Sequence, residues 1–232
     1  MFLGIDACPA GWYAVHNTAL DSQITGKVNA RFSDILADAL PTSVITVDIP
    51  IGLRSAGNRP CDELARKALA PRRSSSVFAA PLRPVLCAAS HQEASAIRRG
   101  IDGKGMSIQS FAITRKVEEV DRALEKASNH DRRVYEVHPE VCFTRLNRGV
   151  PMAFATKTSA GRAERLDLLR LAFGDAPARL VEERVRKQVG ADDVLDAFAA
   201  LWSAMRIGRD EHESMPTIPD HDAQGRRMAI CY

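Results

Sequence analysis

Three carboxylates stand close together in "GADDVLDAFAAL", residues 190–201, which otherwise has the composition of a buried helix. Asp192 and Asp193 suit a first helical turn, where an acidic side chain accepts backbone N–H bonds and favours the positive end of the helix dipole. Asp196 lies about one turn further in, where the apolar pattern indicates burial on nearly all sides. Because a buried carboxylate without a partner is costly, Asp196 requires a cation, a proton or a hydrogen-bond donor from elsewhere in the chain.

Two further acids each follow an apolar run that is typical of a buried strand. Asp6 follows residues 2–5, and Asp48 ends the β-branched run that begins at Val44. Each could also be a simple turn residue, because a "CPAG" turn follows the first and Pro50 follows the second. Binding and catalytic sites in α/β sheets are built at strand ends, and together with the late acidic helix this favours a functional interpretation of both.

The order of the expected elements indicates how these acids are positioned. Residues 59–129 are helical and basic, and we interpret them as an insertion or crossover between two strands. The alternating "RRVYEVHPEVCF" predicts a last strand at 132–143. The other expected elements are strands at 2–5, 12–16, 24–32 and 44–48, a helix at 33–40 capped by Ser33, and helices at 157–173, 177–190 and 190–202. This order predicts an α/β layered fold with a mixed sheet.

Length and composition indicate a single domain over residues 1–232, with room for an inserted subdomain. The 32 basic and 29 acidic residues give a formal net charge of +3, which is too small to indicate nucleic-acid binding by itself. Five scattered cysteines without a CxxC pair favour free thiols in a reducing compartment over a disulfide framework or a zinc site. No apolar run approaches the length of a membrane span. We therefore expect a soluble cytoplasmic protein that has no membrane partner.

The stretch "EVHPE" offers a candidate proton carrier. On a regular strand Glu136, His138 and Glu140 would share one face, and a histidine among carboxylates is a tunable proton shuttle. A strand-edge histidine is also commonly a hydrogen-bonded structural residue. We expect Glu136, rather than Glu140, to reach the acids if this strand pairs beside the one that ends at Asp48.

A basic, serine-rich segment offers candidate phosphate ligands. Arg72, Arg73 and Arg83 surround three serines that include Ser75, and arginine forks with hydroxyl groups are suited to phosphate. The alternative is an ordinary solvated loop. Weaker candidates of the same kind are Gln109 and Lys157, together with Lys104 and Arg165.

Several motifs, in one order, resemble those of a known family. They are "GIDACPAGW", "VDIPIGL", "RPCDELARKAL", "RRSSSVFAAP", "GMSIQSFAI", "EVDRAL", "YEVHPEVCF", "KTSAGRAERLDLL" and "DDVLDAFAAL". From about residue 3 to about residue 206 the chain resembles an uncharacterised bacterial and archaeal family of predicted ribonuclease H-like nucleases, domain of unknown function 429. The resemblance implies a mixed five-stranded sheet flanked by helices, with a helical insertion after the fourth strand.

The same resemblance implies roles for the acids. Ribonuclease H-like proteins carry acids on the first strand, on the adjacent fourth strand and on a late helix. These positions correspond to Asp6, to Asp48 and to Asp193 with Asp196, and "DxxDA" is similar to the last helix of Holliday-junction resolvases. Residues three apart on a helix face the same way. Gathered carboxylates suit Mg²⁺ or Mn²⁺, and two such ions about 4 Å apart can hydrolyse a phosphodiester.

The resemblance thus implies a metal-dependent nuclease that acts on DNA or RNA. Catalytic roles would fall to Asp6, Asp48, Asp193, Asp196, Glu136 and His138, of which the four aspartates would also be metal ligands. One alternative is a non-catalytic module on the same fold that binds nucleic acid or another partner. A further alternative is an actin-like phosphotransfer enzyme, which would require glycine-rich phosphate loops and usually two such domains.

Overall fold

The computed structural model describes residues 1–18, 21–126 and 133–232. Its elements, in chain order, are β1 (Phe2–Cys8), β2 (Gly11–Thr18), β3 (Asp21–Asn29), α1 (Phe32–Asp38), β4 (Val44–Val47), α2 (Pro60–Ala68), the 3-10 turns η1 (Ser74–Ser76) and η2 (Arg83–Val85), α3 (His91–Asp102), α4 (Ile108–Ala112), α5 (Thr114–Lys126), β5 (Val134–Glu136), α6 (Pro139–Leu146), α7 (Ser159–Phe173), α8 (Ala176–Glu183), α9 (Ala191–Gly208), β6 (Ser214–His221) and β7 (Arg227–Cys231).

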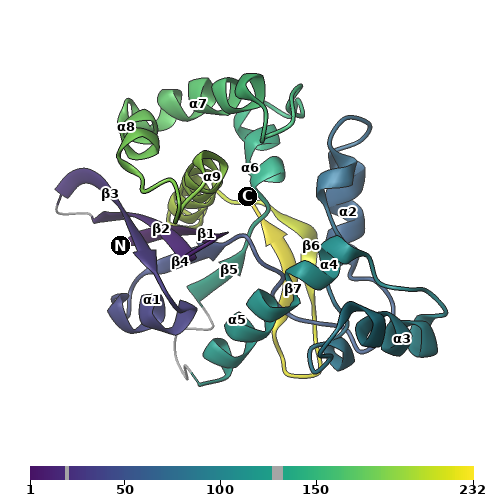
Figure 1. Ribbon diagram of the computed structural model, residues 1–232. Coiled ribbons are helices and arrows are strands. Elements are labelled where there is room, and N and C mark those ends of the chain that lie inside the picture. The colour runs from purple at the N-terminus through teal and green to yellow at the C-terminus, as the bar shows by residue number, and fades with distance from the viewer. Residues whose placement is uncertain (19–20, 127–132) are drawn as a thin grey trace.

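Five strands form one mixed sheet in the order β3-β2-β1-β4-β5 (Figure 1). The strands β1, β2 and β3 pair antiparallel, whereas β4 is parallel to both β1 and β5. Parallel strands require a long crossover, and the segment from α2 to α5 supplies it between β4 and β5. The expected α/β fold with a mixed five-stranded sheet flanked by helices is confirmed. The expected end of the helical segment, near Asn129, lies outside the described residues.

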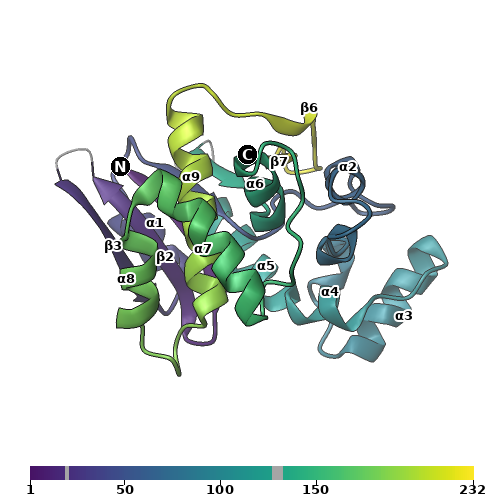
Figure 2. The ribbon, with the colours of Figure 1, turned by 90° about the horizontal axis from the view of Figure 1, so that it is seen from above.

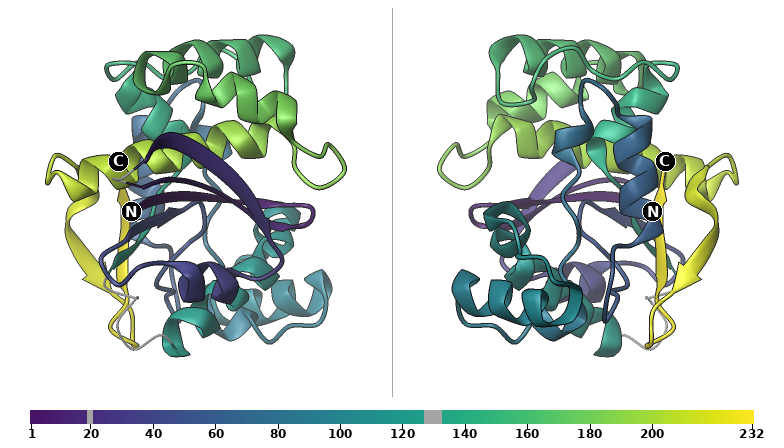
Figure 3. Two further views of the ribbon diagram at one scale, coloured as in Figure 1. Left: turned by 90° about the vertical axis from the view of Figure 1, so that its left-hand side faces the viewer. Right: turned by 90° about the vertical axis from the view of Figure 1, so that its right-hand side faces the viewer.

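Helices cover both faces of this sheet because its strands are apolar on both sides. Leu3 and Ile5 of β1 face a core that is shared with α1 and α5. The opposite face packs against α6, α7, α8 and α9. Seen along the edge of the sheet, these four helices lie on one side, and α1 and α5 lie on the other (Figure 3). None of the described helices is both long and apolar enough to cross a membrane.

Helix α9 is enclosed between the sheet and the outer helices. It contacts β1, β2 and β4 on one side and α6, α7 and α8 on the other, and the view from above shows α7 and α8 on the same side of the sheet as α9 (Figure 2). This explains why ten of its residues are buried, Val194, Leu195, Ala197, Phe198, Ala199, Ala200, Leu201, Ser203, Ala204 and Ile207. A helix that is apolar nearly all round must be buried nearly all round.

The contact between α9 and β1 is unusually close. A Cβ atom placed on Gly4 would lie 2.0 Å from the backbone nitrogen of Leu201 and 2.2 Å from the carbonyl oxygen of Ala197. On the neighbouring strand, the Thr46 hydroxyl donates to the carbonyl oxygen of Ala200 at 2.7 Å. The helix backbone therefore rests directly on the sheet.

Three local expectations differ from the structure. Ser33 does not cap α1, because the helix begins at Phe32, whose N–H donates to the Glu119 side chain of α5 at 2.7 Å. The last strand ends at Glu136, and α6 begins at Pro139, where a proline suits the first helical turn. The tail after α9 forms a hairpin of β6 and β7, where the sequence pattern predicted no strand.

We expect Gly4→Ala to lower the free energy of unfolding by at least about 2 kcal/mol, because the added methyl group meets backbone atoms that cannot move independently. Gly100→Ala in α3 is the matched control, since a Cβ atom there meets nothing within 4 Å. The control should be stabilising by about 0.5–1 kcal/mol. Urea titration followed by circular dichroism measures both, and equal effects at the two positions would contradict the close packing.

Candidate functional site

Asp6 and Asp48 lie on neighbouring strands, as predicted. The register pairs Ile5 of β1 with Val47 of β4, and the N–H of Asp48 continues the ladder by donating to the carbonyl oxygen of Ile5 at 3.0 Å. Gly4 is paired with Thr46 in this register, and both face α9. Because side chains alternate along a strand, the two aspartates, two residues further on, face α9 as well.

The direction of α9 brings its acids to the same point. Leu201 lies over Gly4. Ala197 also lies over Gly4, and Asp196, which precedes it, is close enough to Asp6 to raise its pKa. The first helical turn of α9 thus stands above the ends of β1 and β4.

Burial and mutual repulsion raise the pKa values of these acids. Asp6 is 8% exposed, and its pKa lies well above the ordinary value because of burial first, and then because of the charges of Asp48, Asp196 and Asp193. Burial is also the largest cause of the raised pKa of Asp196, followed by the charges of Asp48 and Glu140. Burial raises the pKa of Asp48 to about 6, although the neighbouring His138 charge lowers it. The cluster therefore favours a proton or a cation.

Asp193 has a capping role beside its place in the cluster. Its Oδ2 accepts a hydrogen bond of 2.8 Å from the N–H of Gly190, the residue that precedes α9. Burial raises its pKa, whereas this hydrogen bond and the charge of Lys157 lower it. The capping interpretation of this residue is therefore correct. The same carboxylate is close enough to the cluster to raise the pKa of Asp6.

Glu140 lies near the acid cluster, although the strand pattern favours Glu136 for this position. It is 6% exposed, and its Oε1 accepts a hydrogen bond from the fully buried Arg165. Its Oε2 accepts no hydrogen bond from any described residue and lies 3.6 Å from Nε of Arg73. Its charge raises the pKa of both Asp48 and Asp196. The helical start at Pro139 turns this side chain toward the cluster.

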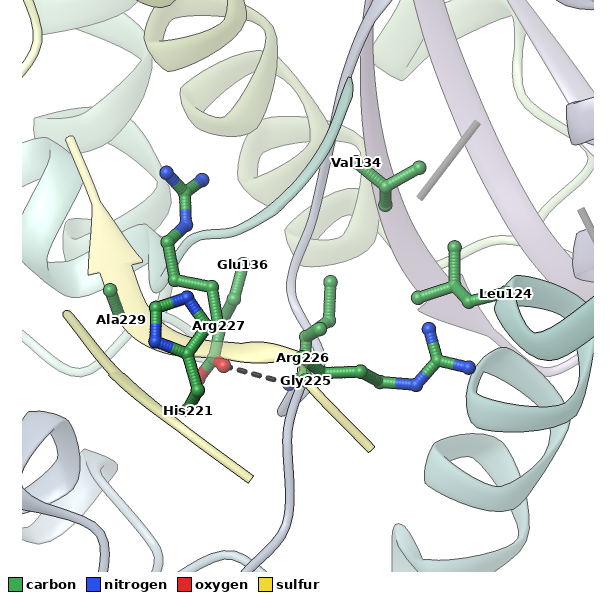
Figure 4. A pocket seen from close by; sticks show the side chains of 9 residues that line it. Leu124, Val134, Glu136, His221, Gly225, Arg226, Arg227 and Ala229 are labelled. Atoms are coloured by element: carbon green, nitrogen blue, oxygen red, sulfur yellow. Dashed lines mark hydrogen bonds between the residues drawn. The ribbon is translucent and has the colours of Figure 1, made fainter. Parts of the chain in front are cut away.

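The expectation that Glu136 reaches the acids is wrong. The register pairs Glu136 with Val47, one residue before Asp48, so its side chain lies on the opposite face of the sheet. Its carboxylate accepts bonds from Arg59 at 2.7 and 2.8 Å and from the N–H of Ile51 at 2.7 Å. Figure 4 shows Glu136 at a cavity of about 240 Å³ on that side, where the dashed line marks the bond from Ile51.

Cys61, Asp62 and Glu136 offer ligand atoms that all lie within 4.8 Å of one another. The guanidinium of Arg59 already neutralises this group, since it bonds to both carboxylates. We therefore assign the group to the structural core rather than to a metal. Within the described ranges no three carboxylates of the acid cluster come that close, which is consistent with their mutual repulsion.

The candidate phosphate ligands have different surroundings. Arg73 lies beside Glu140, and Lys157 is exposed and near enough to lower the pKa of Asp193. Arg83 differs, since it donates to Asp121 at 2.8 Å and to Asp222 at 2.7 Å. Its guanidinium is therefore engaged within the protein. Four of the other candidates are exposed, Arg72, Ser75, Lys104 and Gln109. Arg165, by contrast, is fully buried and donates to Glu140, so its guanidinium is also engaged within the protein.

Comparison with known proteins gives one family. A family model described as "Protein of unknown function (DUF429)" matches residues 4–221, and the chain therefore belongs to this family. No curated protein matches the chain, and no solved structure matches it.

The raised pKa of Asp48 predicts how stability depends on pH. A carboxyl group that binds its proton more tightly in the folded protein than in the unfolded chain makes the metal-free protein more stable as pH falls. For Asp48 this gain extends from pH 7 through its pKa of about 6 toward 3.8, the ordinary pKa of aspartate. Asp48→Asn should remove this contribution and raise the free energy of unfolding at pH 7 by roughly 1–2 kcal/mol. Thermal unfolding in EDTA between pH 5 and 7 measures the difference between wild type and variant.

The comparison with a variant is necessary because burial lowers the pKa values of His16 and His212. These two shifts make the folded protein less stable as pH falls over the same range. Asp167→Asn is the control, because Asp167 forms an exposed pair with Arg170. We expect that control to change stability by less than about 0.5 kcal/mol. An Asp48→Asn protein with the pH profile of wild type would contradict the raised pKa.

Proposed function

We propose that this member of the DUF429 family is a metal-dependent nuclease that hydrolyses phosphodiester bonds of DNA or RNA on a ribonuclease H-like fold. The observation that carries the proposal is the convergence of Asp6, Asp48 and Asp196 from two adjacent strands and a late helix. The order β3-β2-β1-β4-β5 supports the fold assignment, because the first and fourth strands are neighbours in it.

The donor set fits Mg²⁺ or Mn²⁺. All its ligand atoms are carboxylate oxygens, which these hard cations prefer, and burial together with neighbouring charges raises the pKa values of the acids, which favours the binding of a cation. Asp6, Asp48, Asp193 and Asp196 would hold the metal, and the buried Oε2 of Glu140 offers one further oxygen. Two such ions, when bound, would supply an activated water and would neutralise the leaving oxygen.

The remaining residues of the site would orient the substrate and carry protons. Arg73 and Lys157 stand beside the acids with cationic groups that suit phosphate oxygens. His138 neighbours Asp48 and points Nε2 toward the carbonyl oxygen of Ser76 at 3.4 Å. Its buried Nδ1 has no hydrogen-bond partner among the described residues. We assign proton transfer to this imidazole.

We expect Mn²⁺ or Mg²⁺ to raise the melting temperature of the protein, because binding to the native state alone shifts the unfolding equilibrium. Asp6→Asn should remove most of this metal response and should raise the metal-free melting temperature, since it deletes one repelling charge. Differential scanning calorimetry with and without metal measures both. Glu136→Gln is unsuitable as a control, because Glu136 pairs with Arg59, and Asp167→Asn serves instead. An unchanged response in Asp6→Asn would locate the metal elsewhere.

We expect the protein to cleave some single-stranded, branched or hybrid nucleic acid with Mn²⁺ or Mg²⁺. Ca²⁺ should support cleavage poorly, because its looser coordination holds the attacking water less well. Asp6→Asn and Asp48→Asn should each lower the cleavage rate at least about 100-fold while binding is largely retained. A panel of labelled DNA and RNA substrates, resolved on denaturing gels with wild type and variants in parallel, measures this.

The proposed nuclease function is rejected if wild type cuts no substrate in the panel, or if Asp6→Asn cuts as fast as wild type. Retained binding without cleavage would favour the non-catalytic binding module on the same fold.

A further inference from the structure

A cavity of about 200 Å³ opens directly beside the acid cluster. Asp48, which belongs to the cluster, and its neighbour His138 both line this cavity. Most of the remaining wall is apolar, and it is built by Pro50, Val77, Phe78, Ile113, Val137 and Ile230. These residues come from five separated segments of the chain. The cavity is therefore a feature of the folded protein and cannot be read from one motif.

The polar floor of this cavity has no hydrogen-bonding capacity left for a charged ligand. Arg59 uses its N–H groups on the carbonyl oxygens of Ile51 and Gly52 and on the carboxylates of Asp62 and Glu136. Guanidinium has five such donors, and all are occupied. Because one guanidinium faces two carboxyl groups, the floor does not attract a phosphate. The group that enters must be uncharged and largely apolar.

Phe78 both lines the cavity and reaches solvent. It contributes to the wall, yet 44% of its surface remains exposed. Aromatic side chains in this position serve as platforms on which nucleic-acid bases stack, whatever the base. The apolar face of Phe78 and the acids at Asp48 thus border the same small space.

We propose that this cavity receives the base of an unpaired nucleotide whose phosphate lies at Asp48. The proposal rests on the nuclease function proposed above and narrows its substrate to single-stranded or locally unpaired nucleic acid. The volume of about 200 Å³ lies below the range of about 300–1,000 Å³ that accommodates drug-sized ligands, and so it suits one base rather than a base pair. A base within a duplex would first have to leave the stack, which costs a few kcal/mol.

The test measures binding in Ca²⁺, which should support cleavage poorly, with fluorescein-labelled single-stranded DNA and RNA, the matched duplex and a strand of abasic units. Phe78→Ala should weaken binding of the single strands about 10-fold, within the range known for stacking on an aromatic side chain. Binding of the duplex and of the abasic strand should be unchanged, because neither presents a free base. Phe78→Trp should bind single strands at least as tightly as wild type.

Leu171→Ala is the matched control, since Leu171 of α7 is 83% exposed and does not line the cavity. Melting temperatures of all variants establish that they fold. The base site is rejected if Phe78→Ala binds single strands as wild type does, or if it loses equal affinity for the abasic strand, or if wild type binds none of the probes. If wild type cleaves nucleic acid but binding does not depend on Phe78, the base site is rejected and the nuclease proposal is retained. If binding depends on Phe78 but wild type cleaves nothing, the nuclease proposal is rejected and the base site is retained.

Discussion

The contact of α9 with β1 at Gly4 determines where the acids can meet. The absence of a side chain at Gly4 lets the helix backbone reach the strand, and the hydroxyl of Thr46 holds the helix from the neighbouring strand. A larger residue at Gly4 would push the helix outward and would carry Asp196 away from Asp6. The position of the candidate site is thus a consequence of backbone packing, and the acids contribute repulsion rather than attraction to it.

The buried and half-buried acids discussed above fall into two groups according to their partners. Glu136 and Glu140 are each held by a buried arginine, Arg59 in one case and Arg165 in the other. Such pairs fix the geometry of a core more than they stabilise it. The carboxylates of Asp48 and Asp196 have no such arginine bond among the described contacts, and their pKa values are raised. Burial raises the pKa of Glu136 as well, so the absence of an arginine bond among the described contacts, and not the pKa shift, distinguishes Asp48 and Asp196 from the two glutamates.

The sequence predicted the structural elements that depend on local pattern. It did not predict the side-chain positions that depend on contacts with distant residues. The five strands and the late helix were expected because apolar runs indicate them. The adjacency of Asp6 and Asp48 was expected from the resemblance to ribonuclease H-like proteins, not from local pattern. Alternation suggested one face for Glu136 and Glu140, yet the helix that begins at Pro139 places them apart. Likewise, the cap of α1 comes from Glu119 in a distant helix, which no local pattern reveals.

A cluster of like charges can persist only if the surrounding chain prevents it from opening. The chain after Asp48 is held by Arg59, which bonds to the carbonyl oxygens of Ile51 and Gly52, and by Glu136, which accepts the N–H of Ile51. Repulsion at Asp48 is therefore opposed by a fully bonded network three residues further along. This arrangement keeps the like charges close together while the loop stays fixed, and a cation at the proposed site would offset their repulsion. The same network forms the floor of the cavity beside Asp48, so that one set of bonds shapes both the acidic and the apolar parts of the site.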